Sequence, residues 1–302
     1  MKKICVLGSI NIDLVTKTPR FAQPGETLEG EAFNTFPGGK GANQAVAARR
    51  LGADVTFLGK VGSDAFAGVA LEALRSAGVK IEHIETEDTS TGTATIVVNA
   101  QGENSIIIVP GANGRVDISY VQNHIEVIDN ADFLLLQLEV PLETVVWAAR
   151  YAAEHGKTVI LDPAPARMLP EALLTCCGII TPNETELQVV TGVPVAGDAG
   201  IRHAADLLLA QGVGCVVNKR GAKGAYWLTR DDMTGIPGFA VTAVDTTAAG
   251  DSFNAGLAVS LAKGNDMAES IRYANAVGAI SVTKMGAQSA MPTADEVSRL
   301  IG

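Results

Sequence analysis

The sequence predicts an α/β fold in which helices connect the strands of a mostly parallel sheet. Apolar runs with the length of buried strands alternate along the chain with helix-like runs. The composition agrees: 47% of the residues are hydrophobic, only 5% are aromatic, and 32 glycines suit tight turns between strands and helices. No long Pro/Ser-rich linker interrupts the alternation, so we expect residues 1–302 to form a single domain.

The elements of this sheet and its connections follow in order along the chain. Buried strands are expected at Ile4–Gly8, Val55–Val61, Asp132–Leu138, Thr158–Asp162, Gly178–Thr181 and Gly214–Asn218. Helices are expected at Gly41–Leu51, Asp64–Ala77, Leu142–Glu154, Glu184–Thr191, Gly200–Gln211, Ser252–Ala262 and Met267–Thr283.

Two regions depart from the alternation and predict a second, smaller sheet. Asn11–Pro37 is polar and turn-rich, with alternating residues towards its end. Thr93–Asn99 and Ser105–Val109 are β-branched runs separated by five turn-forming residues, which is typical of a hairpin. We expect residues 12–37 and 93–109, approximately, to form a small β-sheet lid over a site, or a dimer surface.

Charge and residue usage exclude several classes of partner. The net charge of −10 and the isoelectric point near 4.9 argue against binding to nucleic acid or to an anionic membrane surface. No run approaches the ~20 apolar residues of a membrane span, and the N-terminus lacks the pattern of a signal peptide. We expect a cytoplasmic protein with reduced thiols at Cys5, Cys176, Cys177 and Cys215. The histidines are scattered without metal-ligand spacing, and none is assigned a role: His83, His124, His155 and His203.

The segment Asp245–Gly256 carries the strongest chemical signal. Small residues, Thr247 to Gly250, precede a carboxylate, Asp251, at the start of an apolar helix. The N-terminus of a helix offers unpaired N–H groups and positive potential, which suit a phosphoryl group. Asp251 in the first turn is then placed to take a proton from a substrate hydroxyl. An ordinary capped helix is the alternative interpretation.

Candidate ligand-binding residues lie after two other predicted strands and after a pair of glycines. Asn11 and Asp13 lie just beyond the first strand, where open parallel sheets bind ligands, although Asn and Asp also form simple turns. In the segment 37–45, Gly38 and Gly39 precede a helix that carries Asn43, as expected for contacts to neutral hydroxyl groups. Neither the G-x-G-x-x-G nor the P-loop spacing is present. Glu139 after Phe133–Leu138 is either a ligand for a hydroxyl or a solvated carboxylate.

Two further turns are suited to a nucleotide. Asn183 and Glu186 have the spacing of a capping box, which is one interpretation of the pair. The alternative is that they organise the waters of Mg²⁺ near the phosphates of a nucleotide. Residues 219–224 place two glycines and three cations, Lys219, Arg220 and Lys223, in one turn. A solvated basic loop is the other interpretation of that turn.

In order and spacing these motifs resemble the ribokinase family of carbohydrate kinases over essentially the whole chain. The strongest signatures are Gly38–Asn43, continuing into Val61–Asp64, and Asp245–Asp251. The resemblance implies a doubly wound α/β domain with a β-sheet lid, usually shared in a homodimer. It also implies transfer of the γ-phosphoryl group of ATP to the 5-hydroxyl of D-ribose.

The resemblance also implies roles for individual residues. Asp251 would be the base, with an anion hole at the backbone of residues 248–251, including Ala249 and Gly250. The sugar would be held by Asn11, Asp13, Gly39, Lys40, Gly41, Asn43 and Glu139. ATP, with Mg²⁺, would be held by Asn183, Glu186, Lys219, Arg220, Gly221, Ala222, Lys223, Gly224, Gly250 and Asn275. A monovalent cation, K⁺, would be held by Asp245, Thr247, Ser281, Lys284, Gly286 and Ala290, largely through carbonyl oxygens.

The chain departs from the family pattern at four positions. Ala290 stands where a serine oxygen is common, Asn218 and Arg220 where residues are usually apolar, and Ser252 where threonine is frequent. None of these positions is the base or the anion hole. A sister kinase for deoxyribose, fructose or pseudouridine is the nearest alternative function. A sugar sensor without turnover and a nicotinamide oxidoreductase are the alternatives from other classes.

Overall fold

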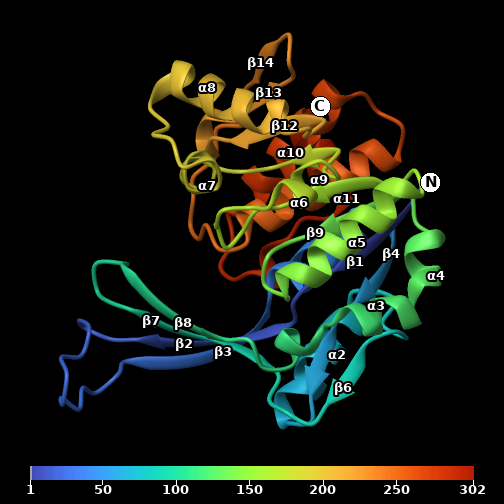
Figure 1. The fold of residues 1–302 in the computed structure, drawn as a ribbon. Coiled ribbons are helices and arrows are strands. Elements are labelled where there is room, and N and C mark those ends of the chain that lie inside the picture. Colours follow the sequence, from blue (N-terminus) through green and yellow to red (C-terminus); the bar gives the residue numbers. More distant parts are fainter. Residues whose placement is uncertain (1) are drawn as a thin grey trace.

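The computed structural model, which describes residues 2–302, is built around an eight-stranded sheet with helices on both faces (Figure 1). The strand order is β14-β13-β12-β11-β10-β9-β1-β4. Six strands run parallel and two, β13 and β14, form an antiparallel edge hairpin. Along the sheet, the strands are β14 (Met233–Ile236), β13 (Ala225–Leu228), β12 (Cys215–Lys219), β11 (Ile179–Ile180), β10 (Thr158–Leu161), β9 (Phe133–Leu136), β1 (Lys3–Leu7) and β4 (Asp54–Leu58). The expected doubly wound, mostly parallel sheet is confirmed.

The sheet separates two apolar cores because successive side chains of a strand point to opposite faces. In β1, Ile4 and Val6 pack into one core, whereas Cys5 and Leu7 pack into the other. The first core is covered by α1 (Lys40–Arg50), α2 (Ala65–Ser76), α9 (Ala249–Ala262), α10 (Met267–Ser281) and α11 (Ala294–Ile301). The second core is covered by α3 (Ile118–Asn123), α4 (Ile125–Asp129), α5 (Leu142–Glu154), α6 (Glu171–Leu174), α7 (Glu184–Thr191) and α8 (Gly197–Ala210).

The helices predicted from the sequence are all present, and α5 and α7 have the expected bounds. The short helices α3, α4 and α6, the C-terminal α11 and the hairpin β13–β14 were not predicted. Three 3₁₀ turns complete the connections: η1 (Gly111–Arg115), η2 (Gly221–Lys223) and η3 (Gln288–Ala290).

The strand expected over Val55–Val61 is wrong in one respect, because it is two strands. The chain leaves the main sheet at Gly59 and continues as β5 (Lys60–Gly62), which pairs with β6 (Glu85–Glu87) in a separate ribbon. The hydroxyl of Tyr120 accepts a hydrogen bond from Gly59 N at 2.8 Å and lies 2.9 Å from Gly59 O. A side chain therefore satisfies the peptide groups that a continuous strand would pair.

A four-stranded sheet extends away from the main body, at the left of Figure 1. Its order is β3-β2-β7-β8, with β2 (Asn11–Lys17), β3 (Ala32–Gly38), β7 (Gly92–Val98) and β8 (Asn104–Val109). The predicted hairpin is present as β7–β8, and the turn-rich region 11–37 contains two paired strands. This small sheet exposes large apolar side chains, including Phe33 at 62% and Ile107 at 65%.

Two further sequence expectations concern features outside the sheet. Within residues 2–302, no helix is both long and apolar enough to cross a membrane. The four cysteines are free thiols, as expected. Burial raises the pKa of the Cys5 and Cys177 thiols well above the usual range, so these two are inert core groups.

Candidate active site

The candidate site lies at the carboxyl ends of the central strands, where the N-termini of α1 and α9 meet. Asp251, in the first turn of α9, is 5% exposed. Its Oδ2 accepts a hydrogen bond from Asn43 Nδ2 at 3.0 Å, and its Oδ1 accepts one from Gln44 Nε2 at 3.2 Å. A carboxylate has about four acceptor positions, so Asp251 keeps capacity for a ligand hydroxyl.

The electrostatic surroundings of Asp251 favour a base that titrates near neutral pH. Burial raises the pKa of Asp251 to about 6; nearby Lys40 opposes this shift, and the carboxylate of Asp162 adds to it. Because a general base works best with a pKa near the working pH, this environment suits proton abstraction.

The start of α9 provides unpaired backbone donors next to this carboxylate. The helix begins after Ala248, whose φ of 58° is the one positive value of a non-glycine residue in the described part of the chain. Within residues 2–302, the N–H groups of Gly250 and Asp251 meet no protein acceptor, and no side chain caps the helix. Two unpaired donors and the helix dipole therefore point to the same place, which is suited to an anion.

The residues expected to hold a sugar form a connected cluster around Glu139. The Oε2 atom of Glu139 accepts hydrogen bonds from Ser9 Oγ at 2.5 Å, from Lys40 N at 3.1 Å and from Asn11 Nδ2 at 3.4 Å. The structure thus brings together Asn11, Lys40 and Glu139 from three elements that are distant in sequence.

Glycines let the start of α1 approach the end of β1. Gly39 has a φ of 89°, and a Cβ there would lie 2.7 Å from Asn11 N. A Cβ on Gly41 would lie 2.7 Å from Gly8 Cα. These contacts leave no room for a side chain, so the glycines themselves set the position of Asn11 relative to Asn43.

Asp13 lies in β2, two residues after Asn11, and is influenced by the charges of Glu139 and Lys40. Burial raises the pKa of Asp13 to about 6, with a further contribution from Glu139 and an opposing one from Lys40. Within residues 2–302 its carboxylate makes no hydrogen bond, so its oxygens are free to accept from a ligand hydroxyl.

Four polar residues of the site were not identified from the sequence. Gln44 donates to Asp162 Oδ2 as well as to Asp251, and Asn113 Nδ2 donates to Asn11 Oδ1 at 2.7 Å. Gln288 Nε2 donates to Asn43 Oδ1 at 3.2 Å. Asp162 was visible as a carboxylate at the end of a predicted strand, but the other three give no local sequence signal.

Two lysines balance the acidic groups. Burial lowers the pKa of Lys40, but the carboxylates of Asp251, Asp162, Glu139 and Glu186 outweigh it, and the net shift is upward. Lys219 Nζ lies 2.9 Å from Asp162 Oδ1 and 3.6 Å from Glu186 Oε2. The same balance raises the pKa of Lys219, where Asp162 and Glu186 overcome the cost of burial. Both side chains are therefore cations at neutral pH.

The residues expected to hold a nucleotide line a more open rim. Asn183 and Glu186 form a capping box at the start of α7, so both interpretations of this pair remain compatible with the structure. Glu186 uses Oε2 for the cap and for Lys219, while Oε1 has no hydrogen-bond donor among the described residues. Gly221, Ala222 and Lys223 form the exposed turn η2.

Two expected nucleotide contacts are occupied by the protein itself. The guanidinium of Arg220 packs 4.2 Å from the ring centroid of Tyr226 and forms ion pairs with Glu184 and Asp198. The amide of Asn275 donates to the carbonyl oxygens of Ile236 and Pro237. Gly224 lies against the same segment, since a Cβ there would be 2.1 Å from Ile236 O.

Asp245 links the two segments that are expected to bind the cation, one at Thr247 and the other at Gly286. Its Oδ1 accepts from Thr247 N and Oγ1, and its Oδ2 accepts from Gly286 N at 2.9 Å. Burial opposes ionisation of Asp245, but these hydrogen bonds prevail and lower its pKa. The side chains of Ser281 and Lys284 bond instead to Gly278 O and Glu296, and Ala290 is buried.

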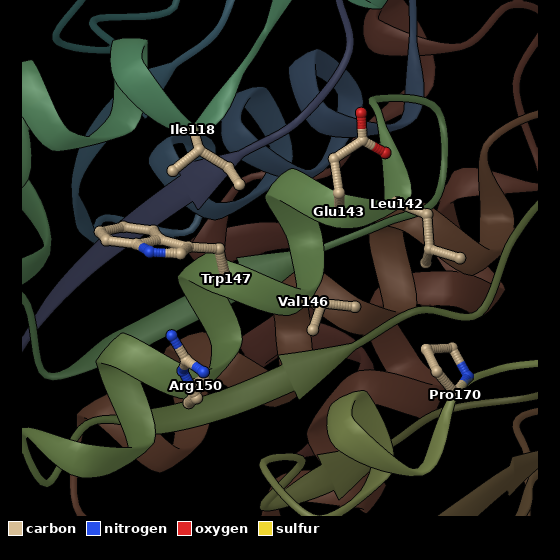
Figure 2. Close-up of a pocket in the computed structure, with 7 residues that line it drawn as sticks. All are labelled: Ile118, Leu142, Glu143, Val146, Trp147, Arg150 and Pro170. Atoms are coloured by element: carbon tan, nitrogen blue, oxygen red, sulfur yellow. The ribbon is translucent and has the colours of Figure 1, made fainter.

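A separate groove of about 440 Å³ lies on the outer face of α5 (Figure 2). Trp147 and Arg150 of α5 border it, with Ile118 on one side and Pro170 on the other. None of the residues discussed above lines it, so the groove is not part of the candidate site.

Comparison with known proteins places the whole chain in one family. Residues 1–294 match the pfkB family carbohydrate kinase description. The chain is 45% identical to ribokinase of Haemophilus influenzae, covering 98% of this chain and 97% of that protein. It is 41% identical to deoxyribokinase of Salmonella typhi, covering 99% and 98%. The structure of Arabidopsis thaliana ribokinase complexed with ribose and ATP superposes with a TM-score of 0.94 at 33% identity, covering 99% and 98%.

Proposed function

The chain belongs to the pfkB family of carbohydrate kinases, and from this premise we propose that it uses ATP to phosphorylate the 5-hydroxyl of D-ribose. The observation that carries the proposal is the buried Asp251 beside two unpaired N–H groups at the start of α9. A base and an anion site in contact are the minimum equipment for transfer of a phosphoryl group to an alcohol.

Asp251 accepts the proton of the attacking hydroxyl. Asn43 and Gln44 donate to its two oxygens and hold the carboxylate in one orientation. Its pKa of about 6 leaves it ionised at neutral pH yet basic enough to take part in the proton transfer.

The N–H groups of Gly250 and Asp251 stabilise charge on the transferring phosphoryl group. They are fixed by the first turn of α9 before any ligand binds, so they need no reorganisation during the reaction. Ala249 and Gly250 are small, so the phosphate can approach the backbone closely.

The sugar is held by hydroxyl contacts to Asn11, Asp13, Asn43 and Glu139, with Lys40 nearby. Gly39 and Gly41 position the start of α1 and contribute backbone contacts. Asp13 supports a preference for ribose over deoxyribose, because its unpaired, half-buried carboxylate needs a hydroxyl donor such as the 2-hydroxyl.

ATP is held along the rim formed by Asn183, Glu186, Asn275 and residues 219–224. The amide nitrogen of Asn275 is engaged by Ile236 O and Pro237 O, so its contribution to ATP comes from Oδ1. The side chain of Arg220 is engaged by Glu184 and Asp198, so its contribution to ATP comes from the backbone. The unused Oε1 of Glu186 fits a magnesium-bound water, and Mg²⁺ would neutralise charge on the phosphates when bound.

A K⁺ ion beside the anion site is the proposed activator. Asp245 already links the loop at Thr247 to the loop at Gly286, as a cation site between them requires. Backbone carbonyls of Ser281, Lys284 and Ala290 are proposed to complete it. The cation would orient the segment that leads into α9.

The small sheet is proposed to act as a lid within a single-domain kinase of residues 1–302. Its exposed face, with Phe33 and Ile106–Val109, is proposed to pair with a second copy in a homodimer. We also propose cytoplasmic action, because ATP is the phosphoryl donor and the four cysteines are free thiols.

The proposal is tested by an ADP-release assay with Mg-ATP, with and without K⁺. The acceptors are D-ribose, 2-deoxyribose, fructose, adenosine and pseudouridine. We expect the highest kcat/KM with D-ribose. A preference for 2-deoxyribose would assign the activity named for the Salmonella relative instead. Binding of ribose without ADP release from any acceptor would favour a sensor.

A further inference from the structure

We propose that His83, His124 and Glu126 form a binding site for a transition-metal ion such as Zn²⁺, outside the candidate active site. The Nδ1 atoms of His83 and His124 lie 3.4 Å apart, and His83 Nδ1 lies 3.7 Å from Glu126 Oε1. All three ligand atoms lie within 4.8 Å of one another.

These separations match those of ligands around one small ion. Zinc binds imidazole nitrogen at about 2.0–2.1 Å with tetrahedral geometry, which places neighbouring ligand atoms about 3.3 Å apart. Two imidazoles and one carboxylate are a donor set that suits Zn²⁺, Cu²⁺ or Ni²⁺ rather than Mg²⁺. The three protein ligands leave a fourth position for water.

A second carboxylate supports the arrangement from behind. His124 turns Nδ1 towards His83, while its other ring nitrogen, Nε2, lies 3.0 Å from Glu85 Oε1. Metal-bound histidines usually donate their second N–H to a carboxylate in this way, which fixes the tautomer and the ring. Glu85 is itself held by Lys60, whose Nζ lies 3.2 Å from Glu85 Oε2.

Tyr120 contacts both histidines before any metal binds. Its hydroxyl donates to the backbone His83 O at 2.6 Å, and its ring packs edge-on against His124 with centroids 5.0 Å apart. Tyr120 therefore holds the backbone of His83 and the ring of His124 in place, which reduces the ordering cost of binding an ion.

The cluster is accessible from solvent. The side chain of His83 is 29% exposed, and that of Glu126 is 55% exposed. Both residues also line a cavity of about 280 Å³ beside α4, which gives an ion and its waters an entry path. A bound ion would join the turn before β6 to the junction of α3 and α4, two segments that are distant in sequence.

The test is a Zn²⁺ titration of metal-free protein, without ATP, in competition with a chromogenic chelator. We expect one tight equivalent, weakened at least about tenfold in His83→Ala and in His124→Ala. Glu85→Gln should weaken binding by about 10–100-fold if it supports His124 as described. His203→Ala is the matched control, because His203 is an exposed histidine on α8 outside the cluster.

Zinc K-edge X-ray absorption should show two imidazole ligands in the parent protein and lose that signal in the doubly substituted His83→Ala/His124→Ala protein. Phosphorylation activity with Mg-ATP confirms that each variant is folded, since none of these residues belongs to the active site. Equal zinc binding by the parent and the double variant, or the absence of a tight equivalent in the parent, would overturn the proposal.

Discussion

The two ends of the candidate active site differ in how far they are preorganised in the absence of a ligand. At the sugar end, Asn11, Asn43 and Asp251 are at most 6% exposed. Asn43 is hydrogen-bonded to Asp251, and Asn11 accepts a hydrogen bond from Asn113. At the nucleotide end, the turn 221–223 and the loop around Thr247 are exposed. A base and its hydroxyl partner require fixed geometry, whereas a nucleotide that must leave after each turnover is better held by adaptable loops.

The largest expected effect comes from removing the base at the rigid end. Asp251→Asn should lower kcat by roughly 10²–10⁴-fold, the usual contribution of a general base. Asparagine preserves the shape and the hydrogen bonds from neighbouring amides in part, so ribose binding measured by calorimetry should change much less than kcat. A variant with near-normal turnover would remove Asp251 from the proposed role.

The anion site allows a substitution that should obstruct the phosphoryl group without disturbing the packing of the protein. A Cβ on Gly250 would lie 3.5 Å from Lys219 Nζ, an ordinary contact, so Gly250→Ala should fold normally. It should nevertheless lose about 10²-fold in kcat, because the methyl group occupies space required by the phosphoryl group. Circular dichroism melting and the ADP-release assay measure the two effects.

Gly68→Ala in α2 is the matched control for that variant, since nothing lies within 4 Å of its Cβ position. It should retain full activity and gain about 0.5–1 kcal/mol in the free energy of unfolding, the usual difference between alanine and glycine in a helix. If both variants kept full activity, the N–H groups of α9 would not face the phosphoryl group.

The pH dependence of kcat/KM should reflect ionisation of the carboxylates at the sugar end of the site, including Asp251. With pKa values of about 6, Asp251 and the sugar-binding Asp13 both lose their negative charge below that pH, so kcat/KM should fall at least about tenfold from its plateau to pH 5. Stability should change in the opposite direction. The folded protein binds the proton of Asp251 more tightly than the unfolded chain, so the group's contribution to stability is full below pH ~4 and is lost as pH rises through about 6.

Asp251→Asn provides the control for the stability effect. The stability of the variant relative to the parent should increase from pH 4 to pH 8, because the variant carries no buried charge at this position. Thermal melting at both pH values measures this. The same stability difference at both pH values would contradict the raised pKa.

The smallest effect is expected at the nucleotide end, at Arg220, one of the residues expected from the sequence to bind ATP. Arg220→Ala should change the KM for ATP by less than about threefold, because the guanidinium already pairs with Glu184 and Asp198 at the surface. A large rise in KM would show that Arg220 leaves those partners to bind the nucleotide, and that this end rearranges more than we propose.

Much of the fold was predictable because its signals are local. The periodicity of apolar residues indicates helices such as α5 and α7, and the capping box of Asn183 and Glu186 also marks the start of α7. The break at Gly59 was not predictable, because it depends on Tyr120, which lies 61 residues away. In the site, Asp251, Asn43 and Glu139 were identified from motifs, whereas Gln44, Asn113 and Gln288 act only through partners distant in sequence.

The fold class, the family resemblance and the order of the motifs along the strands and helices could all be inferred from the amino-acid sequence. These depend on residue type and spacing over short segments, where backbone preference and burial act directly. Which polar groups are paired and which remain free depends instead on how the folded chain places them in space. The folded chain pairs Arg220 with Glu184, and no acceptor among residues 2–302 meets the N–H groups of Gly250 and Asp251. It also brought together His83 and His124, which the sequence showed as scattered. Pairing is a property of distance and direction in space, and a linear spacing of 41 residues carries no information about either.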